Sequence, residues 1–470
     1  MSAEAGRTQV KLTCASSLLD TLVSVAKLLN DMPLDRANRL YLHPIHQDTY
    51  KTLVSLIANL RQCRSFEDFH HFQQTLLEEI LKIQGHGQAC ARVAKRLRKG
   101  RTVPADAPEL RSGEDIHDPG SWELEADVCE RVERQLRSIA DALAWRVFNY
   151  DRPVIVALSR NELAGPMIGK EGLEAERGFV LDTWRNDGNF VLLHDPTTCL
   201  RIGDATEFKP IGTHGWEAYL HEIKKDPNRK RSTQRRRTRL AEEAIRDGGP
   251  LPNDPEARLV TLDVPYKTHL PRLRDAFRLA AERGVVAMKV PGGRTLVVAD
   301  VRQGYQLWSE QEFIERTNEA QVRALKRAGI HDVGHHVHYD SYDMTARSPI
   351  QPPWAIYPLP PIVCANLIVD MAVYFVTISS VPLLEALRAA GIAAEWVLPS
   401  GQRQLQRGDV ILRAYKGSRG MEMKPSDMQR PLLELVDLIT WVETVKELLT
   451  RDNIGNHPWP YYRDEHRVWR

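Results

Sequence analysis

The chain has 470 residues, 42% of them hydrophobic, and its 64 Lys and Arg against 62 Asp and Glu leave a formal net charge of +2. This length suffices for about three domains with packed cores. With 28 Gly and 28 Pro, the composition excludes collagen-like and low-complexity architectures. The six cysteines show no CxxC and no paired spacing, which argues against a disulfide framework or a zinc ribbon.

The first residues, MSAEAGRTQVKLT, lack the cationic start and apolar core of a secretory signal. The longest apolar stretch, 361–384, is interrupted by Asn366 and Asp370, and a carboxylate is costly inside a bilayer. The sequence therefore predicts a buried core element in place of a membrane span, and we expect a cytoplasmic protein.

Apolar residues recur at helical spacing over 18–29, 53–60 and 76–81, which predicts a helical N-terminal region over residues 1–98. Residues 99–122 contain three prolines and charges of both signs, which is typical of a linker or exposed loop. Helical periodicity resumes at Leu124 and continues to about Tyr150.

A change to short β-rich runs follows, and a stretch of Gly, Pro and Asp over 247–257 ends it. We expect a nuclease-like α/β domain over 123–247 and a C-terminal α/β domain of unassigned role over 256–470, so that the fold class is multidomain α+β or α/β. The predicted strands are 153–158, 189–194, 199–204, 218–224, 258–264, 284–290, 295–301 and 393–398. The predicted helices are 171–184, 270–283, 381–390 and 431–449.

The segment HEIKK places Glu222 and Lys224 two residues apart on a predicted strand, so both side chains lie on one face. A preceding predicted strand ends at Asp204, and a hairpin through GTHG at 212–215 would bring Asp204 beside Glu222. Two carboxylates suit Mg²⁺, or Mn²⁺, which prefers oxygen ligands, and the carbonyl of Ile223 could add a third. Lys224 would orient the attacking water, which indicates phosphodiester hydrolysis.

Residues 224–239 contain nine Lys or Arg against one acidic residue, Asp226. Their net charge of about +8 leaves about −6 for the rest of the chain, since 2 − 8 = −6. Basic side chains grip a phosphate backbone by charge without reading base sequence. Those predicted to contact nucleic acid are Lys225, Arg229, Lys230, Arg231, Arg235, Arg236 and Arg239.

Together these residues, from about 165 to 245, resemble the PD-(D/E)xK nuclease superfamily, which has the restriction-endonuclease-like fold. The resemblance implies that Asp204 and Glu222 bind the metal and that Lys224 is catalytic. It further implies that Gln234 is the helix glutamine near the site and that Glu174 is the acidic residue of the first helix, with Glu176 an equal candidate. Gly203-Asp204 replaces the expected Pro-Asp, and Asp195 is a competing first carboxylate.

The resemblance implies a Mg²⁺-dependent nuclease that acts on DNA rather than RNA, in restriction, defence or repair. The alternative is a non-catalytic nucleic-acid-binding protein or interaction scaffold with a nuclease-like core, in which Glu222 and Lys224 form an ordinary surface pair. In either case the helical or C-terminal region could bind a protein partner or a second copy of the chain.

A second cluster, HDVGHHVHYDSYD, carries four histidines at His331, His335, His336 and His338. Their spacing allows a metal site in principle. The alternating residues after Gly334 favour a polar loop that enters a strand.

Overall fold

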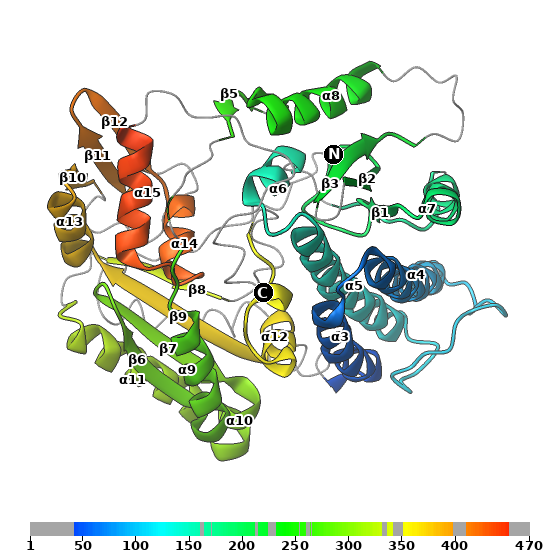
Figure 1. Cartoon of the computed structure of the whole chain (residues 1–470). Coiled ribbons are helices and arrows are strands. Elements are labelled where there is room, and N and C mark those ends of the chain that lie inside the picture. Colours follow the sequence, from blue (N-terminus) through cyan, green and yellow to red (C-terminus); the bar gives the residue numbers. More distant parts are fainter. Residues whose placement is uncertain are drawn as a thin grey trace.

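The computed structural model describes residues 42–159, 164–170, 172–211, 215–223, 232–252, 254–259, 264, 266–330, 336–341, 351–397 and 410–450. Long helices and small antiparallel sheets alternate along this part of the chain (Figure 1). The expected mixture of helix and strand is therefore confirmed.

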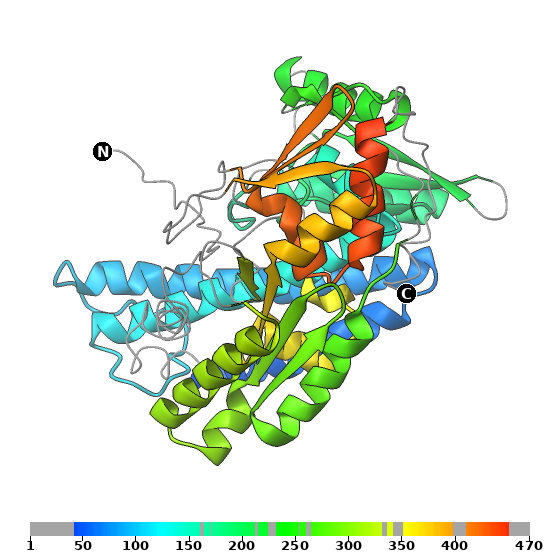
Figure 2. The same cartoon turned by 90° about the vertical axis from the view of Figure 1, so that its left-hand side faces the viewer.

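Three helices form the N-terminal layer: α3 (Pro44–Gln62), α4 (Phe66–Leu97) and α5 (Pro119–Val147). Ser65 begins α4 with a capping box, and Asp118 caps α5, so both helices start where a side chain satisfies free backbone N–H groups. The two long helices lie side by side (Figure 2). They approach closely at Gly87, where a Cβ atom would lie 2.7 Å from Cys129 Cβ.

The segment predicted as a linker, 99–122, divides into a loop and the first turn of α5, which begins at Pro119. Leu110 in the loop and Trp122 in the helix are buried together with Cys90 of α4. The loop therefore has an apolar core of its own at the far end of the helical layer.

The first sheet has the strand order β1 (Phe190–Leu193), β2 (Ala205–Ile211), β3 (Gly215–His221), all antiparallel. It follows α6 (Arg152–Leu158) and α7 (Leu173–Asp187), and α8 (Ser232–Asp247) comes after it. Gln73 of α4 takes the place of a neighbouring strand at the free edge of β1: its amide Nε2 donates to the Val191 carbonyl at 2.8 Å and its Oε1 accepts from Leu193 N at 2.9 Å.

Two predicted strands in this region are wrong. Residues 153–158 form α6, because Asp151 accepts a hydrogen bond from Val154 N and Pro153 occupies the first helical turn, where it fits best. Residues 199–204 form an irregular loop. Its start is held by the buried Asp141 carboxylate, which accepts from Cys199 N at 2.9 Å.

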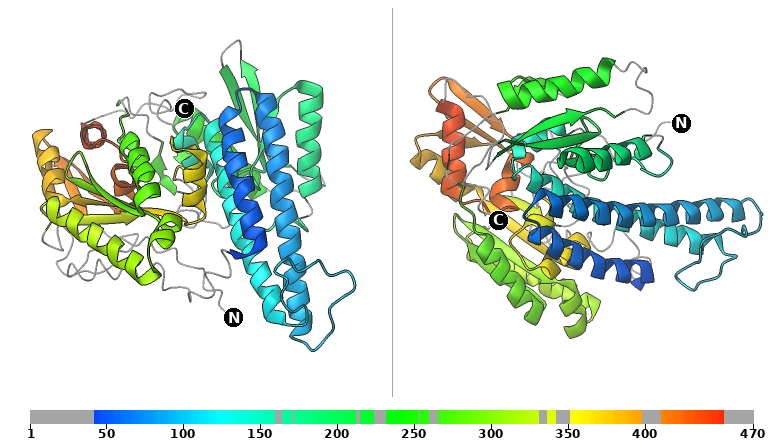
Figure 3. Two further views of the ribbon diagram at one scale, coloured as in Figure 1. Left: turned by 90° about the horizontal axis from the view of Figure 1, so that it is seen from below. Right: turned by 45° about the vertical axis from the view of Figure 1, so that its right-hand side comes forward.

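The C-terminal half is built on a four-stranded antiparallel sheet in the order β6 (Val285–Val290), β7 (Arg294–Asp300), β9 (Ala372–Ser379), β8 (His336–Asp340). Adjacent residues of β9 point to opposite faces: Tyr374 meets Phe277 of α9 (Leu270–Arg283), and Phe375 packs with Ala320 and Ala324 of α11 (Glu310–Arg327). The two helices therefore cover opposite faces of the sheet (Figure 3).

Smaller elements complete this half. The predicted strands 284–290 and 295–301 and the helix 270–283 are confirmed, whereas the predicted strand 258–264 lies largely outside the described residues. The predicted C-terminal helix begins later than expected, at Leu438. The remaining elements are β4 (Pro250–Leu251), β5 (Asp254–Arg258), α10 (Val301–Leu307), η2 (Trp354–Ile356), α12 (Pro361–Ile368), α13 (Ser380–Ala389), β10 (Ala393–Trp396), β11 (Leu412–Lys416), β12 (Arg419–Met423), η3 (Pro425–Met428), α14 (Gln429–Leu432) and α15 (Leu438–Thr450).

The apolar stretch 361–384 becomes α12, β9 and the start of α13, and most of its side chains are buried in the core. This confirms the predicted core element. Among the described helices, none is both long and apolar enough to cross a bilayer.

Polar bonds join the helical layer to the C-terminal half. The Arg61 guanidinium of α3 donates to the carbonyls of Leu359 at 2.5 Å and Tyr357 at 2.6 Å. Arg131 of α5 pairs with Asp370 at 2.8 Å. One hydrophobic cluster runs from α3 to α15, so the expected domains share a continuous core.

Candidate functional site

The hairpin of β2 and β3 brings Asp204 to the residues around Glu222, as the sequence predicted. Ala205 pairs with His221, and Asp204 N donates to the His221 carbonyl at 2.8 Å. The Asp204 carboxylate then accepts a hydrogen bond from Ile223 N at 2.7 Å. Asp204 therefore precedes β2 and does not end an earlier strand, but it lies where the antiparallel register places it opposite Glu222.

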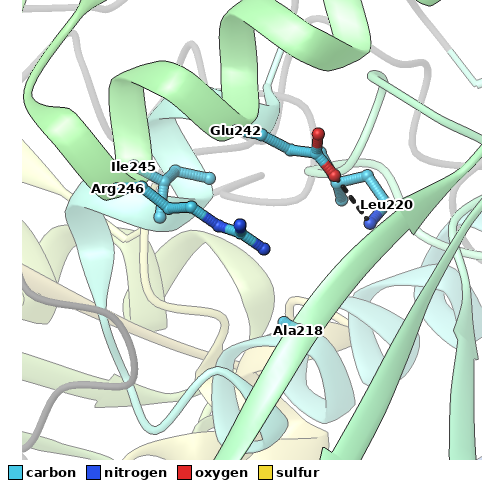
Figure 4. A pocket seen from close by; sticks show the side chains of 5 residues that line it. All are labelled: Ala218, Leu220, Glu242, Ile245 and Arg246. Carbon is cyan, nitrogen blue, oxygen red and sulfur yellow. Dashed lines mark hydrogen bonds between the residues drawn. The ribbon is translucent and has the colours of Figure 1, made fainter.

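Glu222 is held by the helix that follows the hairpin. Thr238 of α8 is buried and donates its hydroxyl to Glu222 Oε1 at 2.9 Å. One turn further along α8, Glu242 accepts a hydrogen bond from Leu220 N at 3.3 Å and lines a small pocket between α8 and β3 (Figure 4). Two contacts therefore fix α8 against the end of β3.

A lysine and two carboxylates lie beside the hairpin. Lys170 Nζ donates to Glu176 Oε1 at 2.8 Å and to Asp195 Oδ2 at 2.5 Å. Arg137 of α5 fixes the loops that carry these groups, because its guanidinium donates to the carbonyls of Gly165 at 2.9 Å and Asp195 at 2.5 Å. The cluster is therefore anchored to the helical layer.

The charges of this cluster are tightly coupled. Burial and, to a smaller extent, the charges of Asp195 and Asp204 raise the pKa of Glu176 against the opposing effect of Lys170, with a net value of about 7. Although burial lowers the pKa of Lys170, its hydrogen bonds to Asp195 and Glu176 outweigh burial and raise it. Near neutral pH, Glu176 is therefore much more readily protonated than an exposed glutamate, while Lys170 stays charged.

Of the two glutamates proposed for the first helix, the structure brings Glu176 to the cluster and leaves Glu174 outside. The Glu174 side chain is 83% exposed and pairs with Arg177 at 3.5 Å, whereas Glu176 is 1% exposed. The two residues lie about 200° apart around the helix axis. The structure therefore places Glu176, and not Glu174, beside Lys170 and Asp195.

Several other predicted residues lie in or next to the basic segment. Lys224, Lys225, Arg229, Lys230 and Arg231 lie outside the described residues. On α8, the main-chain carbonyl of Gln234 accepts from Thr238 Oγ1 at 3.2 Å, so Gln234 lies one turn before the residue that holds Glu222. The exposed side of the same helix carries Arg235, Arg236 and Arg239, and Arg239 pairs with Glu243 at 3.3 Å.

The histidine cluster enters a strand, as one of the two interpretations predicted. His331 and His335 lie outside the described residues, while His336 and His338 are buried on β8. His338 Nδ1 bonds the Thr377 hydroxyl at 2.9 Å and its ring stacks on Phe375. Both histidines are therefore built into the sheet.

The chemistry of the donor set fits a hard divalent cation. Glu176 Oε2 is buried and has no hydrogen-bond partner among the described residues, and a buried carboxylate oxygen without a partner is costly. Asp204 lies close enough for its charge to act on Glu176. Carboxylate oxygens are the ligands that Mg²⁺ and Mn²⁺ prefer. Within the described ranges, Glu176, Asp204 and Glu222 do not bring their ligand atoms within 4.8 Å of one another, so side-chain movement would be needed for all three to hold one ion.

Sequence reasoning missed Lys170. The segment GPMIGKEG contains it, but that segment has no phosphate-loop spacing, and nothing in the pattern indicates a partner 25 residues away. The contact arises because α5 ties two distant loops together.

A different set of metal-binding residue types converges elsewhere in the part of the chain that is described. His86 and Cys90 of α4 and Glu125 of α5 place their ligand atoms within 4.8 Å of one another. The sequence analysis did not identify this group. Its signal was present in part, because His86 and Cys90 are four residues apart and share one helix face.

Comparison with protein-family models, with curated proteins and with solved structures finds no match to this chain.

Proposed function

We propose that the chain is a Mg²⁺- or Mn²⁺-dependent nuclease with a restriction-endonuclease-like core over about residues 165–245. It acts on DNA rather than RNA and serves restriction, defence or repair. The observation that carries the proposal is the junction at the end of β3, where the Asp204 carboxylate accepts from Ile223 N beside the buried Glu176. One oxygen of Glu176 has no partner within the described ranges, and a purely structural role leaves this unexplained.

The order of the elements supports the resemblance. A helix with a buried glutamate, three antiparallel strands and a second helix follow one another as α7, β1, β2, β3 and α8. The acidic residue Asp204 directly precedes the second strand, and Glu222 directly follows the third. These positions agree with those that the PD-(D/E)xK resemblance implies for the metal ligands.

Each side chain has a distinct task in the proposed reaction. Glu176, Asp204 and Glu222 hold the cation, and Thr238 keeps Glu222 in position through its hydroxyl. A bound divalent ion lowers the pKa of water and offsets the charge that develops on the phosphodiester. Lys170 reduces the repulsion between Glu176 and Asp195 by bonding to both, and Lys224 orients the attacking water.

The exposed arginines of α8 supply contacts to the substrate. Arg235 and Arg236 are both exposed on α8. Arg236 lies about 200° around the helix from Thr238, which holds Glu222, whereas Arg235 lies about 60° from Thr238. Positive charge beside a phosphodiester site binds the backbone without sequence readout. The substrate class is therefore a polynucleotide.

A specific observation favours the second candidate, a non-catalytic nucleic-acid-binding core. Asp204 and Glu222 each accept a hydrogen bond that stabilises the fold, from Ile223 N and from Thr238. Carboxylates that close a hairpin and hold a helix need no metal to account for them. This candidate predicts nucleic-acid binding that is the same with Mg²⁺ and with EDTA, and no cleavage.

The test compares the purified wild-type chain with Asp204→Asn, Glu176→Gln and Lys224→Ala. Linear, circular and single-stranded DNA and RNA are incubated with each protein in Mg²⁺, Mn²⁺ or EDTA. We expect cleavage of DNA only with a divalent ion, and a loss of at least about 100-fold in each of the three variants, because Asp204 and Glu176 hold the ion that offsets developing charge and Lys224 orients the attacking water.

Glu174→Gln is the matched control, because it makes the same chemical change two residues away on the exposed side of α7. It should cleave like the wild type. Cleavage that persists in EDTA, or that is equal in Glu176→Gln and Glu174→Gln, would overturn the proposal. Metal-independent binding without cleavage would establish the non-catalytic candidate.

A further inference from the structure

A second cluster of ligand-type side chains lies within the helical layer, remote in sequence from the proposed nuclease site but further along α4 from Gln84, which binds the loop before Lys170. His86 and Cys90 face α5 from the C-terminal half of α4, and Glu125 faces α4 from the first turns of α5. The three ligand atoms, an imidazole nitrogen, a thiol sulfur and a carboxylate oxygen, all lie within 4.8 Å of one another.

Glu125 places a carboxyl group in the interior of the helical layer. The residue is 0% exposed. Its Oε2 accepts hydrogen bonds from the main-chain N–H groups of Arg111 at 2.9 Å and Ser112 at 3.2 Å. Within the described ranges, only His43, at 3.3 Å, and His86, at 2.5 Å, make side-chain ion-pair contacts with it.

A carboxylate such as that of Glu125 is costly to bury without a full counter-charge. An isolated carboxylate needs a counter-charge, and neither a lysine nor an arginine side chain in the described residues supplies one here. Main-chain N–H groups contribute only partial charges. A cation between Glu125 and its neighbours would remove this cost.

The residue types select a transition metal over Mg²⁺. Imidazole and thiolate bind Zn²⁺, whereas Mg²⁺ prefers oxygen ligands. We propose that His86, Cys90 and Glu125 bind a Zn²⁺ ion that clamps α4 to α5, with the fourth position open to water on the His86 side. His86 is the exposed member, at 21% of its side chain, while Cys90 and Glu125 are wholly buried.

The geometry needs only side-chain movement. Tetrahedral zinc with ligand distances of about 2.0–2.3 Å separates its ligand atoms by roughly 3.3–3.6 Å. His86 Nε2 and Glu125 Oε1, now 2.5 Å apart, would move apart by about 1 Å to accommodate the ion. His86 and Cys90 are four residues apart on α4, so one helix face already presents two ligands.

The surroundings hold the carboxylate in place for this task. His43 Nε2 lies 3.3 Å from Glu125 Oε2, which also accepts hydrogen bonds from the N–H groups of Arg111 and Ser112. Arg111 N also approaches Oε1 at 3.1 Å, and Oε1 faces His86 Nε2. Hydrogen bonds to a ligating carboxylate fix its orientation toward the metal. Because Arg111 and Ser112 belong to the loop between α4 and α5, the ion would also stabilise that loop.

The test measures zinc in the purified full-length protein, and then replaces it with Co²⁺. We expect about one zinc ion per chain, an absorption band from thiolate to Co²⁺, and a melting temperature that falls when EDTA is added. Cys90→Ser should lose the band and most of the zinc, and His86→Gln should bind zinc weakly.

Two controls match these variants. His71→Gln changes an exposed histidine of the same helix, and Cys63→Ser changes a buried cysteine at the end of α3; both should keep the ion. Asp204→Asn should also keep it, which separates this site from the proposed nuclease site. In case Cys90→Ser fails to fold, His86→Gln provides the second variant, because His86 is the partly exposed member of the cluster.

The absence of both bound zinc and a thiolate band after exposure to excess metal would overturn the proposal. So would a band that survives in Cys90→Ser, or zinc binding by His86→Gln that is as tight as that of the wild type.

Discussion

Replacing Glu176 with Gln should make the protein more stable at alkaline pH and leave its acid stability nearly unchanged. The amide of Glu176→Gln keeps a side-chain oxygen, which can accept the hydrogen bond that Lys170 now donates to Glu176 Oε1. The new amide is never ionised. The variant therefore isolates the cost of burying the Glu176 charge.

The magnitude follows from the pKa of Glu176, which is raised from 4.5 to about 7. Below pH 4.5 the glutamate is protonated in both the folded and the unfolded chain and costs nothing. Between the two values the unfolded chain releases the proton and the folded chain keeps it, so stability falls as the pH rises. Above pH 7 the full penalty applies, about 3 kcal/mol, because a pKa difference of 1 corresponds to about 1.36 kcal/mol.

Urea unfolding at pH 4, 6 and 8 without divalent ions measures this dependence, with Glu174→Gln as the control. We expect the difference between Glu176→Gln and the wild type to grow towards alkaline pH by up to about 3 kcal/mol. Mg²⁺ at pH 8 should stabilise the wild type more than Glu176→Gln, because the ion would bind Glu176 Oε2. A difference that is constant from pH 4 to pH 8 would refute the reasoning.

Two further predictions use matched pairs. Gly87→Ala should be less stable than Gly178→Ala by about 1–3 kcal/mol in urea unfolding. Both substitutions increase helix propensity, but only the new methyl group at Gly87 would meet a neighbour from another helix, Cys129 Cβ at 2.7 Å, whereas the space at Gly178 is open. Equal unfolding midpoints would mean that the close approach of α4 and α5 at Gly87 does not contribute to stability. Arg235→Ala and Arg236→Ala should each weaken DNA binding and reduce the slope of log affinity against log salt by about 1. An unchanged slope in a fluorescence titration would remove these arginines from the interface.

The sequence predicted the long amphipathic helices and the hairpin well, because their periodicity is sustained and their turns are marked. It failed at short apolar runs: residues 153–158 fit a strand or a buried helix equally, and only the cap at Asp151 decides for α6. The run 199–204 has strand-like residues but is held in a loop by the distant Asp141. Such long-range hydrogen bonds have no local signature.

In the candidate site, too, residues with a local sequence signature were predictable and residues positioned by distant contacts were not. Asp204 and Glu222 were predictable because a short hairpin fixes its register through its turn. The choice between Glu174 and Glu176 depended on which side of α7 faces the core, and the helix pattern near its start is too weakly amphipathic to decide this. Lys170 and Glu125 were beyond prediction, because their partners are brought together by the packing of whole helices.

The bond between Gln73 and the edge of β1 has a practical consequence for dissecting this protein into fragments. A fragment that begins at residue 123 would lose the amide that pairs Val191 O and Leu193 N, and it would expose a bare edge strand, a template for self-association. Aggregation or inactivity of such a fragment would report on that lost edge, not on the chemistry of Asp204. Activity should therefore be mapped in the intact chain by single substitutions, so that Gln73 of α4 continues to pair with the edge of β1.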